Sequence, residues 1–385
     1  MGGDILRKLF SLIILIAVLY FSWPTLQKIA ENPSPQSAID HITSKIQTIE
    51  DNPDVQDTFA KLSTGLTELS GKVDEAIAAL PFTSEEQKPK EVKTPNLDVP
   101  ENQTFSVYNV EIGDDRTSVE KTLGQPQRST LNEYGVEWVA YHQNYEHFMM
   151  VAYNQENQVV GLYTNQDLIS STKGIKRGST KETVENTLGE PLTEIRKGFV
   201  YYKLEKDRDY DMYKLDHSFV TIFYDKHENN TVTSIQIMNE NLEEDKQDFY
   251  TKGSKALQKG FEYQLFDLTN AARVNHGLPI LTWDDQVKET ALAHSEDMAE
   301  HNYFDHQNLQ GQSPFDRMKE DNIRFTVAGE NLAYGQFSSI FAHEGLMNSL
   351  GHRKNILQPD FRQLGVGVAF NEEAQPYYTE NFFTK

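Results

Sequence analysis

An internal repeat constrains the fold of this chain more than any other feature. The segment VEKTLGQP at 119–126 returns as VENTLGEP at 184–191, an offset of 65 residues. Each copy reads as a short helix with Val and Leu on one face, ended by a glycine and stopped by a proline. Strand-like runs with hairpin turns follow each copy. The repeat therefore predicts two α+β units packed as one domain over 107–240. The runs are WVAYH, FMMVAY and VVGLY in the first copy, and FVYYKL, FVTIFY and VTSIQI in the second.

The N-terminus carries a segment directed to the membrane. Arg7 and Lys8 precede an apolar run from Leu9 to Trp23. This run is short for the roughly 30 Å hydrocarbon core, but 5–23 spans it if both basic side chains snorkel to the interface. Because positive residues stay on the cytoplasmic side, we expect the rest of the chain outside the cell. A single-pass signal-anchor in the cell membrane is favoured, and a secreted protein follows if the segment is a cleaved signal peptide.

Two segments of different composition connect this anchor to the repeat. In 34–80 apolar residues recur at three- and four-residue spacing, and those at 55–80 follow a heptad pattern. The pattern predicts a helical stalk. The stalk could self-associate as a coiled coil through 55–80, fold back as a hairpin at Asn52-Pro53, or lie as a monomeric amphipathic helix on the bilayer or on its own domains. The segment 81–105 is rich in proline and charge and reads as a linker.

Charge and composition exclude several classes of function. The chain has 36 Lys and Arg against 58 Asp and Glu, a formal net charge of −22. Nucleic acid is therefore not an expected partner, because phosphate binding requires clustered basic residues. The absence of cysteine excludes disulfides, thiolate metal sites and a cysteine nucleophile. An exported protein of this composition must depend on core packing for its stability.

The C-terminal part, 258–385, contains six strings in a fixed order, FDLTNAARVNHGLPILTWDDQV, AHSEDMAEHNYFDHQNLQGQSPFDRM, AGENLAYG, MNSLGHRKNIL, FRQLGVGVAF and YYTENF. Their order and spacing resemble the short bacterial form of the CAP superfamily (cysteine-rich secretory proteins, antigen 5 and pathogenesis-related 1 proteins). The resemblance implies an α-β-α sandwich with a surface cleft, whose polar floor often carries two histidines and two acidic residues. The preceding repeat resembles the CAP-associated N-terminal region of some Gram-positive bacterial proteins, which implies no activity. An α+β chain is expected overall.

The resemblance transfers only two of the four cleft residues to this chain. His306 of YFDH matches the first cleft histidine, and Glu330 of AGENLA matches the first cleft glutamate. Ser349 stands where animal and plant members have a glutamate, and Tyr377 stands where they have a histidine. The tetrad is thus incomplete, which puts a metal or hydrolytic function borrowed from those members in doubt.

Other residues near these strings have expected positions of their own. His352 of GHR could swing into the same cleft, and Tyr377 or Tyr378 could line it. His294 lies on the apolar stripe of its helix and is expected in the core. We expect Arg353 in solvent or at a helix end. The residues that flank Glu330, Gly329 and Asn331, are expected to form a tight turn and backbone hydrogen bonds.

A histidine beside a carboxylate is compatible with three roles. The His306–Glu330 pair could brace two loops, bind a ligand, or act as a general base with its orienting group. A zinc site with His306 and His352 as ligands is a further alternative, although no spacing signature such as HExxH is present. No serine lies in a G-x-S-x-G elbow. No catalytic residue is assigned, and no cofactor is expected apart from the zinc alternative.

Three functions follow from these observations. The leading hypothesis is an extracellular, membrane-anchored binding or scaffolding module whose cleft recognises a lipid, glycan or peptide. The alternative is an extracellular hydrolase, peptidase-like or wall-active, that uses His306 and Glu330 with or without a divalent metal. In the third reading the C-terminal domain is an inert cap on a stalk that oligomerises and recruits partners.

Overall fold

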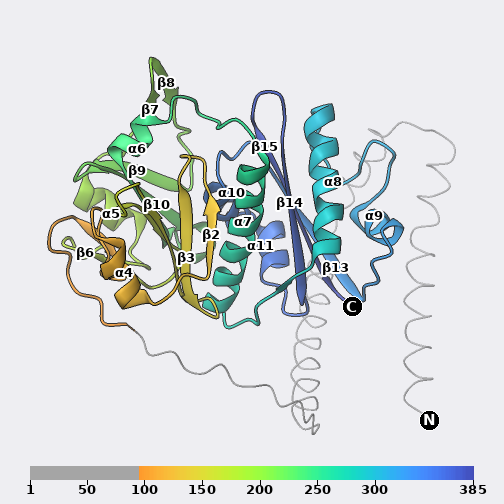
Figure 1. The fold of residues 1–385 in the computed structure, drawn as a ribbon, viewed down its shortest axis with the longest axis horizontal. Coiled ribbons are helices and arrows are strands. Elements are labelled where there is room, and N and C mark those ends of the chain that lie inside the picture. Colours follow the sequence, from red (N-terminus) through yellow and green to blue (C-terminus); the bar gives the residue numbers. More distant parts are fainter. Residues whose placement is uncertain (1–94) are drawn as a thin grey trace, which may run out of the picture. The chain divides into compact units, whose positions relative to one another are not determined.

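The computed structural model describes residues 95–385 (Figure 1). The predicted membrane segment (5–23), the stalk (34–80) and most of the linker (81–105) lie outside the described residues, so the anchor and self-association through 55–80 stay predictions. Within 95–385, no helix has the length and apolarity needed to cross a bilayer.

The predicted repeat forms a seven-stranded antiparallel sheet with two short helices. The eight-residue helices α4 (Arg116–Leu123) and α5 (Lys181–Leu188) each bury one valine. Both end at a glycine with positive φ, 84° at Gly124 and 86° at Gly189, a conformation that favours glycine. The two halves of the sheet meet at β5 and β11. In sheet order the strands are β2 (Arg128–Leu131), β3 (Glu137–Gln143), β4 (Glu146–Tyr153), β5 (Val159–Thr164), β11 (Thr231–Asn239), β10 (Ser218–Asp225) and β9 (Tyr210–Leu215).

One strand of the second copy pairs differently from its counterpart in the first copy. The run FVYYKL forms a strand, as predicted, but Val200–Lys203 (β8) pairs with Glu194–Lys197 (β7) in a separate hairpin. The strand β9 lies beside β10 instead, as β3 lies beside β4. The sequence does not show this difference between the copies, because aromatic and β-branched residues favour any strand and do not show which sheet the strand joins. Phe199, at the hairpin tip, is 97% exposed.

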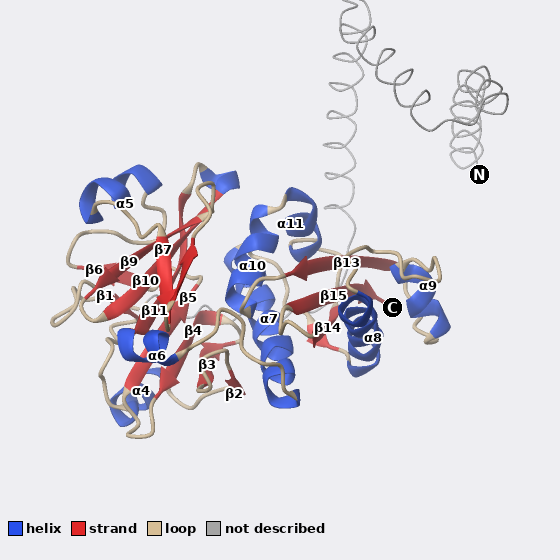
Figure 2. Cartoon of the chain, turned by 90° about the horizontal axis from the view of Figure 1, so that it is seen from above, coloured by secondary structure: helices blue, strands red, loops and turns tan. Residues whose placement is uncertain are grey.

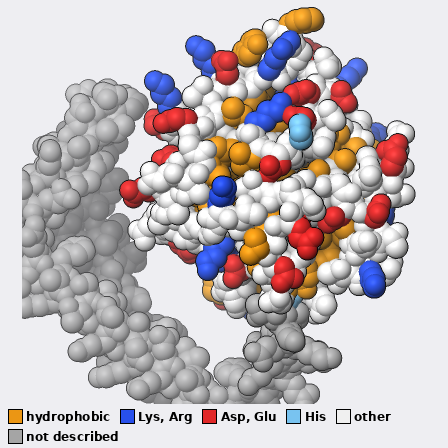
Figure 3. All heavy atoms as spheres, turned by 90° about the vertical axis from the view of Figure 1, so that its left-hand side faces the viewer, with side chains coloured by type: hydrophobic (Ala, Val, Ile, Leu, Met, Phe, Trp, Pro, Cys, Tyr) orange, Lys and Arg blue, Asp and Glu red, His pale blue; other side chains and the backbone are white. Residues whose placement is uncertain are grey.

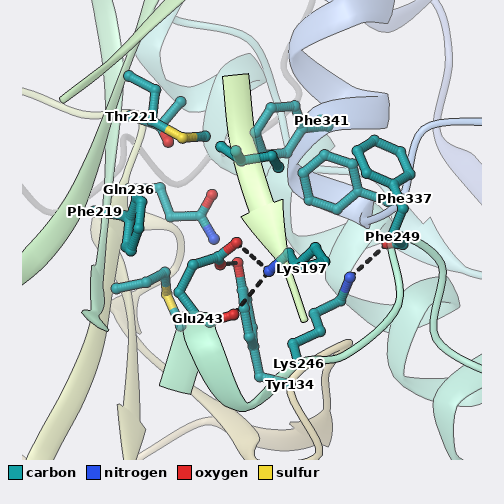
Figure 4. Close-up of a pocket in the computed structure, with 13 residues that line it drawn as sticks. Tyr134, Lys197, Phe219, Thr221, Gln236, Glu243, Lys246, Phe249, Phe337 and Phe341 are labelled. Atoms are coloured by element: carbon teal, nitrogen blue, oxygen red, sulfur yellow. Dashed lines mark hydrogen bonds and ion pairs between the residues drawn. The ribbon is translucent and has the colours of Figure 1, made fainter. Parts of the chain in front are cut away.

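A buried ion pair fixes the end of β7 next to the turn of this hairpin (Figure 4). Lys197 of β7 is 2% exposed and pairs with the carboxylate of Glu243. Its Nζ also donates to the Glu243 carbonyl at 2.8 Å, and the Tyr134 hydroxyl donates to the same carboxylate at 2.5 Å. Glu243 lies in α6 (Glu240–Asp245), which follows the last strand of the sheet. The hairpin is thus held by a charge pair that water does not screen.

The remaining elements of the repeat domain are small. A short two-stranded sheet joins β1 (Phe105–Val107) to β6 (Ile169–Ser171). A single 3-10 turn, η1 (Lys226–Glu228), links β10 to β11.

On the face shown in Figure 3, acidic and basic side chains are interspersed without a large area of one sign.

The C-terminal domain is an α-β-α sandwich (Figure 2). Its sheet, in the order β12-β14-β15-β13, has α7, α10 and α11 on one side and α8 and α9 on the other. The helix α8 approaches β14 so closely that a Cβ on Gly367 would lie 2.1 Å from the backbone nitrogen of Leu292. The elements are α7 (Lys255–Asn275), β12 (Thr282–Trp283), α8 (Asp285–His301), α9 (Pro314–Glu320), β13 (Val327–Tyr334), α10 (Ser339–Asn348), α11 (Leu350–Ile356), β14 (Gln363–Phe370) and β15 (Pro376–Thr384).

The two domains share one core, because α7 and α10 pack against both sheets. Phe341 of α10 meets two rings of the repeat domain, Phe223 at 5.0 Å and Tyr210 at 5.1 Å between centroids. On α7, a Cβ on Gly260 would lie 2.0 Å from the carbonyl oxygen of Leu131 in β2. Only glycine allows the helix this close to the strand. Neither domain could bury these surfaces without the other.

Polar contacts also cross this junction. Asp267 of α7 accepts from Arg128 Nε at 2.8 Å and from the Tyr145 hydroxyl at 2.7 Å. Arg353 was expected in solvent, but its side chain is 11% exposed and pairs with Asp225 at 2.8 Å. The expectation was wrong because the partner lies 128 residues away in the chain, where no local pattern reveals it. Arg353 Nη1 also contacts the end of α10, as expected of a helix-capping arginine.

Glu344, which lies in this junction, leads to a prediction about stability and pH. Its Oε1 accepts from the hydroxyls of Tyr163 and Ser234, both at 2.7 Å, and burial raises its pKa from 4.5 to about 7. The stabilising effect of the protonated carboxyl is therefore complete below pH 4.5 and is lost as the pH rises through 7. Glu344→Gln keeps both hydrogen bonds and does not titrate. Between pH 4.5 and 7.5 we expect the wild type to lose on the order of 3 kcal/mol of unfolding free energy relative to this variant.

Urea unfolding of the full chain across this pH range measures the difference. Glu156→Gln, in an exposed turn of the repeat domain, is the matched control and should follow the wild type. Parallel pH profiles for wild type and Glu344→Gln would show that Glu344 is ionised in the folded protein.

Candidate functional site

The structure brings the two principal candidates together. His306, in the loop between α8 and α9, lies with its Nδ1 2.9 Å from Glu330 Oε1 on β13. The side chain of Glu330 is 1% exposed, whereas that of His306 is 52% exposed. The carboxylate is therefore at the base of the pair, and the imidazole presents its outer edge to solvent.

Arg317 of α9 is the third member of this site and was missed from the sequence. Its Nη2 lies 2.7 Å from Glu330 Oε2, and its Nη1 donates to the His306 carbonyl at 2.8 Å. Both oxygens of the buried carboxylate are thus engaged, one by the histidine and one by the guanidinium. The helix α9 is fixed at its start by a capping box between Ser313 and Asp316. The string FDRM contains this arginine, but the sequence does not show where its side chain points, because that depends on how α9 packs against the rest of the domain.

A pair of asparagines joins α11, which carries His352, to the strand of Glu330. Asn355 Nδ2 donates to the Glu330 carbonyl at 3.1 Å and to Asn331 Oδ1 at 2.9 Å. Asn331 Nδ2 in turn donates to the His352 carbonyl at 3.2 Å. The expected backbone contacts of Asn331 are present, but the expected turn is not. Gly329 and Asn331 lie inside β13, whose register with β15 is unbroken from 327 to 334.

The two histidines have opposite pKa shifts. The hydrogen bond to Glu330 raises the pKa of His306 above 6.5. Burial, followed by the charge on His306, lowers the pKa of His352. As the pH falls, His306 takes up a proton first and hinders protonation of His352. The site therefore combines a cationic donor with a neutral imidazole near pH 6.5.

The tyrosines of β15 face opposite sides of the sheet, and this separates their roles. Tyr378 does not line a cleft: it is 0% exposed, and its hydroxyl donates to the Gln336 carbonyl at 2.9 Å in the core. Tyr377 is 2% exposed and lies beneath Tyr334, with 4.3 Å between ring centroids. The exposed aromatic rings are instead Tyr334 and Phe304, 37% and 49% exposed and 5.9 Å apart. We call these two residues the aromatic ledge.

Comparison with known proteins identifies the family. The family model described as CAP-associated N-terminal matches residues 112–249, and the model of the cysteine-rich secretory protein family matches residues 266–382. The uncharacterized membrane protein YlbC of Bacillus subtilis (strain 168) is 32% identical over 293 residues, which cover 71% of this chain and 82% of that protein. The chain belongs to the cysteine-rich secretory protein (CAP) family.

Further relatives agree with this assignment. The protein YkwD of the same organism is 41% identical over 135 residues, 35% of this chain and 51% of that protein. The crystal structure of an extracellular protein with an SCP domain from Bacillus anthracis is 27% identical, with a TM-score of 0.62, and covers 77% of this chain and 99% of its own. A cysteine-rich secretory protein from Staphylococcus aureus, 16% identical with a TM-score of 0.59, covers 75% of this chain and 99% of its own and shares the fold.

The zinc alternative does not fit the CAP domain of this chain. Within residues 95–385, no three His, Asp or Glu side chains are arranged to hold a metal ion. A zinc ion between His306 and His352 would need Glu330 as its third ligand. The oxygens of that carboxylate already bind His306 Nδ1 and the Arg317 guanidinium, whose charge would repel a cation. We therefore derive no chemistry from zinc at this position.

The remaining predicted residues of the CAP domain are not part of the exposed site. His294 is 1% exposed, as expected, and its Nε2 lies 2.9 Å from the Asp305 carbonyl. Ser349, at the boundary between α10 and α11, is the cap residue for both helices. The aromatic ledge could have been found by alternation, because Tyr334 is four residues beyond Glu330 on the same face of β13.

The hydrogen bond between His306 and Glu330 in the CAP domain leads to a prediction. Glu330→Gln removes the negative charge beside the imidazole, so the pKa of His306 should fall toward 6.5. An NMR titration of the histidine Cε1 protons measures this shift. Glu240→Gln, which removes the carboxylate beside the exposed His217, is the control and should leave the His306 resonance unchanged. An unaltered His306 titration in Glu330→Gln would show that the pair is not hydrogen-bonded in solution.

Proposed function

We propose that this CAP-family chain is an extracellular protein anchored in the cell membrane, and that the surface at His306 binds an extracellular lipid, glycan or peptide. The export and anchoring part of the proposal is supported by the apolar segment at 5–23 and by a relative named as a membrane protein. The binding part is supported by the arrangement of three side chains.

The observation that carries the proposal is the state of Glu330. Its carboxylate is almost completely buried and holds His306 on one oxygen and Arg317 on the other. The His306 ring is therefore fixed in orientation before a ligand arrives, which lowers the entropic cost of binding. Within residues 95–385 its Nε2 makes no hydrogen bond, so a protonated ring offers a donor to an acceptor group of a ligand.

The aromatic ledge extends this surface. Phe304 lies two residues before His306 in the same loop, and its ring is 5.9 Å from that of Tyr334. Exposed aromatic rings beside a fixed polar group provide apolar contact area and a directional hydrogen bond, the usual combination at a recognition site.

A hydrolase is the second candidate, and one observation favours it. A histidine with Nδ1 on a carboxylate and a free Nε2 has the geometry of a general base and its orienting group. Arg317 opposes this role, because it shares the carboxylate and reduces the negative charge that would stabilise an imidazolium. Hydrolysis of peptide or wall substrates by the wild type, lost in His306→Ala, would establish the hydrolase and displace the binding proposal.

His306→Ala is the decisive variant for binding. Glu330 keeps its ion pair with Arg317 in this variant, so the fold should survive. Sedimentation of the full chain measures its binding to three probes: peptidoglycan fragments, phosphatidylglycerol vesicles and unstructured peptides. For the probe that the wild type binds, we expect His306→Ala to lose at least about tenfold in affinity, which corresponds to one charge-assisted hydrogen bond.

The matched control is His217→Ala. His217 is an exposed histidine in the repeat domain whose Nδ1 also lies near a glutamate, at 2.7 Å from Glu240. Equal binding by the two variants would remove His306 from the recognition surface. Failure of the wild type to bind any of the three probes would reject the proposal.

A further inference from the structure

An open pocket of about 250 Å³ lies between α8 and α9, and one of its lining residues, Arg317, contacts Glu330. One wall is a stripe of α8 that includes Ala293, His294 and Asp297, and the opposite wall is α9 with the loop that precedes it. Arg317 lines this pocket and also contacts Glu330. The pocket and the exposed site at His306 are therefore separate spaces joined by one guanidinium.

Two buried side chains on the pocket wall have unpartnered polar atoms. His294 Nε2 donates to the Asp305 carbonyl, so Nδ1 carries the lone pair, and that atom has no hydrogen-bond partner. Arg317 uses both terminal nitrogens, but its Nε–H has no partner. His294 is 1% exposed and Arg317 is 8% exposed. A free acceptor on the α8 wall and a free donor on the α9 wall thus belong to the same pocket.

A third unpartnered group lies behind them. Asn381 is opposite Glu330 in the β13–β15 register, so its side chain is on the same face of the sheet. It is 0% exposed, and neither its amide nitrogen nor its amide oxygen has a partner. Asn381 does not line the pocket. Buried polar groups are normally paired, so the two unpartnered atoms on residues that line it, His294 Nδ1 and Arg317 Nε, indicate a place for polar atoms from outside the chain.

The rim of the pocket restricts the charge of the occupant. Asp297, Glu320 and Asp321 line it, so an anion would meet three carboxylates. A cation would meet the Arg317 guanidinium and would leave the Nε–H donor of Arg317 without an acceptor. A hydroxyl group both donates and accepts, so it matches both kinds of free group. The amide of Gln310 on the α9 side of the pocket suits a hydroxyl as well.

We infer that the α8–α9 pocket binds an uncharged, polyhydroxylated ligand, that is, a saccharide. The inference rests on the proposed function in one respect, because a glycan is among its ligand classes, but it assigns the glycan to a different space from the exposed edge of His306. Arg317 connects the two, so a saccharide that accepts from Arg317 Nε–H binds the same residue that holds Glu330.

A steric variant tests the pocket without altering its buried groups. Ala293 is an exposed residue of α8 that lines the pocket, so Ala293→Trp should fill it. Ala256→Trp, at an exposed alanine of α7, is the matched control. Calorimetric titration of the full chain uses three probes: the neutral tetramer of N-acetylglucosamine, the cationic tetramer of glucosamine, and the anionic tetramer of galacturonic acid.

The wild type should bind the neutral tetramer at least about tenfold more tightly than either charged one. Ala293→Trp should lose this affinity by at least about tenfold, and Ala256→Trp should retain it. Ala293→Trp should leave the binding of phosphatidylglycerol vesicles or unstructured peptides at His306 unchanged, which separates a failure of the proposed function from a failure of this inference. The assignment would be overturned by any of three outcomes. The wild type could prefer a charged probe, both tryptophan variants could lose affinity equally, or the neutral tetramer could fail to bind, with water alone in the pocket.

Discussion

The structure depends on one constraint, the burial of α7 and α10 between two sheets. A helix that meets a sheet on each side must be apolar or paired nearly all round, and α7 meets this requirement with an almost continuous run of buried residues from Phe261 to Arg273. Gly260 then sets how close the repeat domain can come. The CAP domain and the repeat domain are therefore two sequence families joined by one shared hydrophobic cluster, and the repeat domain is part of the scaffold that holds the CAP sheet in place.

The same layer connects the core to the site through buried polar groups. Glu380 on β15 is fully buried, and burial raises its pKa to about 7. Its carboxyl accepts from Thr269 of α7 at 2.9 Å and from Asn331 of β13 at 3.0 Å. Asn331 then contacts Asn355 and the backbone of His352. A continuous set of hydrogen bonds thus runs from the shared helix to the strand of Glu330. Such groups are costly to bury, but they fix the register of elements that apolar packing alone would leave free to slide.

The sequence predicted features that local patterns encode and failed where distant residues decide. The two repeat helices and their glycine ends follow from spacing, and so does the burial of His294. The proximity of His306 and Glu330 came from resemblance, because the two residues are far apart in the chain. Arg317 and Arg353 have buried partners that no local pattern shows. Tyr377 and Tyr378 are adjacent residues whose side chains lie on opposite faces of a strand, and only the register of the sheet determines which of them faces the core.

The chemistry of the site follows from the fact that one carboxylate serves two cations. If Glu330 served His306 alone, its charge would be available to stabilise an imidazolium during proton transfer. Arg317 takes the second oxygen and, through the His306 carbonyl, also fixes the loop that carries the histidine. This arrangement orders the His306 imidazole but makes it less basic. A carboxylate whose charge is partly neutralised by Arg317 raises the pKa of His306 less than a carboxylate that contacts His306 alone. A surface whose polar group is held rigidly is suited to recognition, whereas hydrolysis requires a base whose protonation changes readily in the transition state. The position of Arg317 is therefore the physical reason why we propose binding, and not hydrolysis, for the surface at His306.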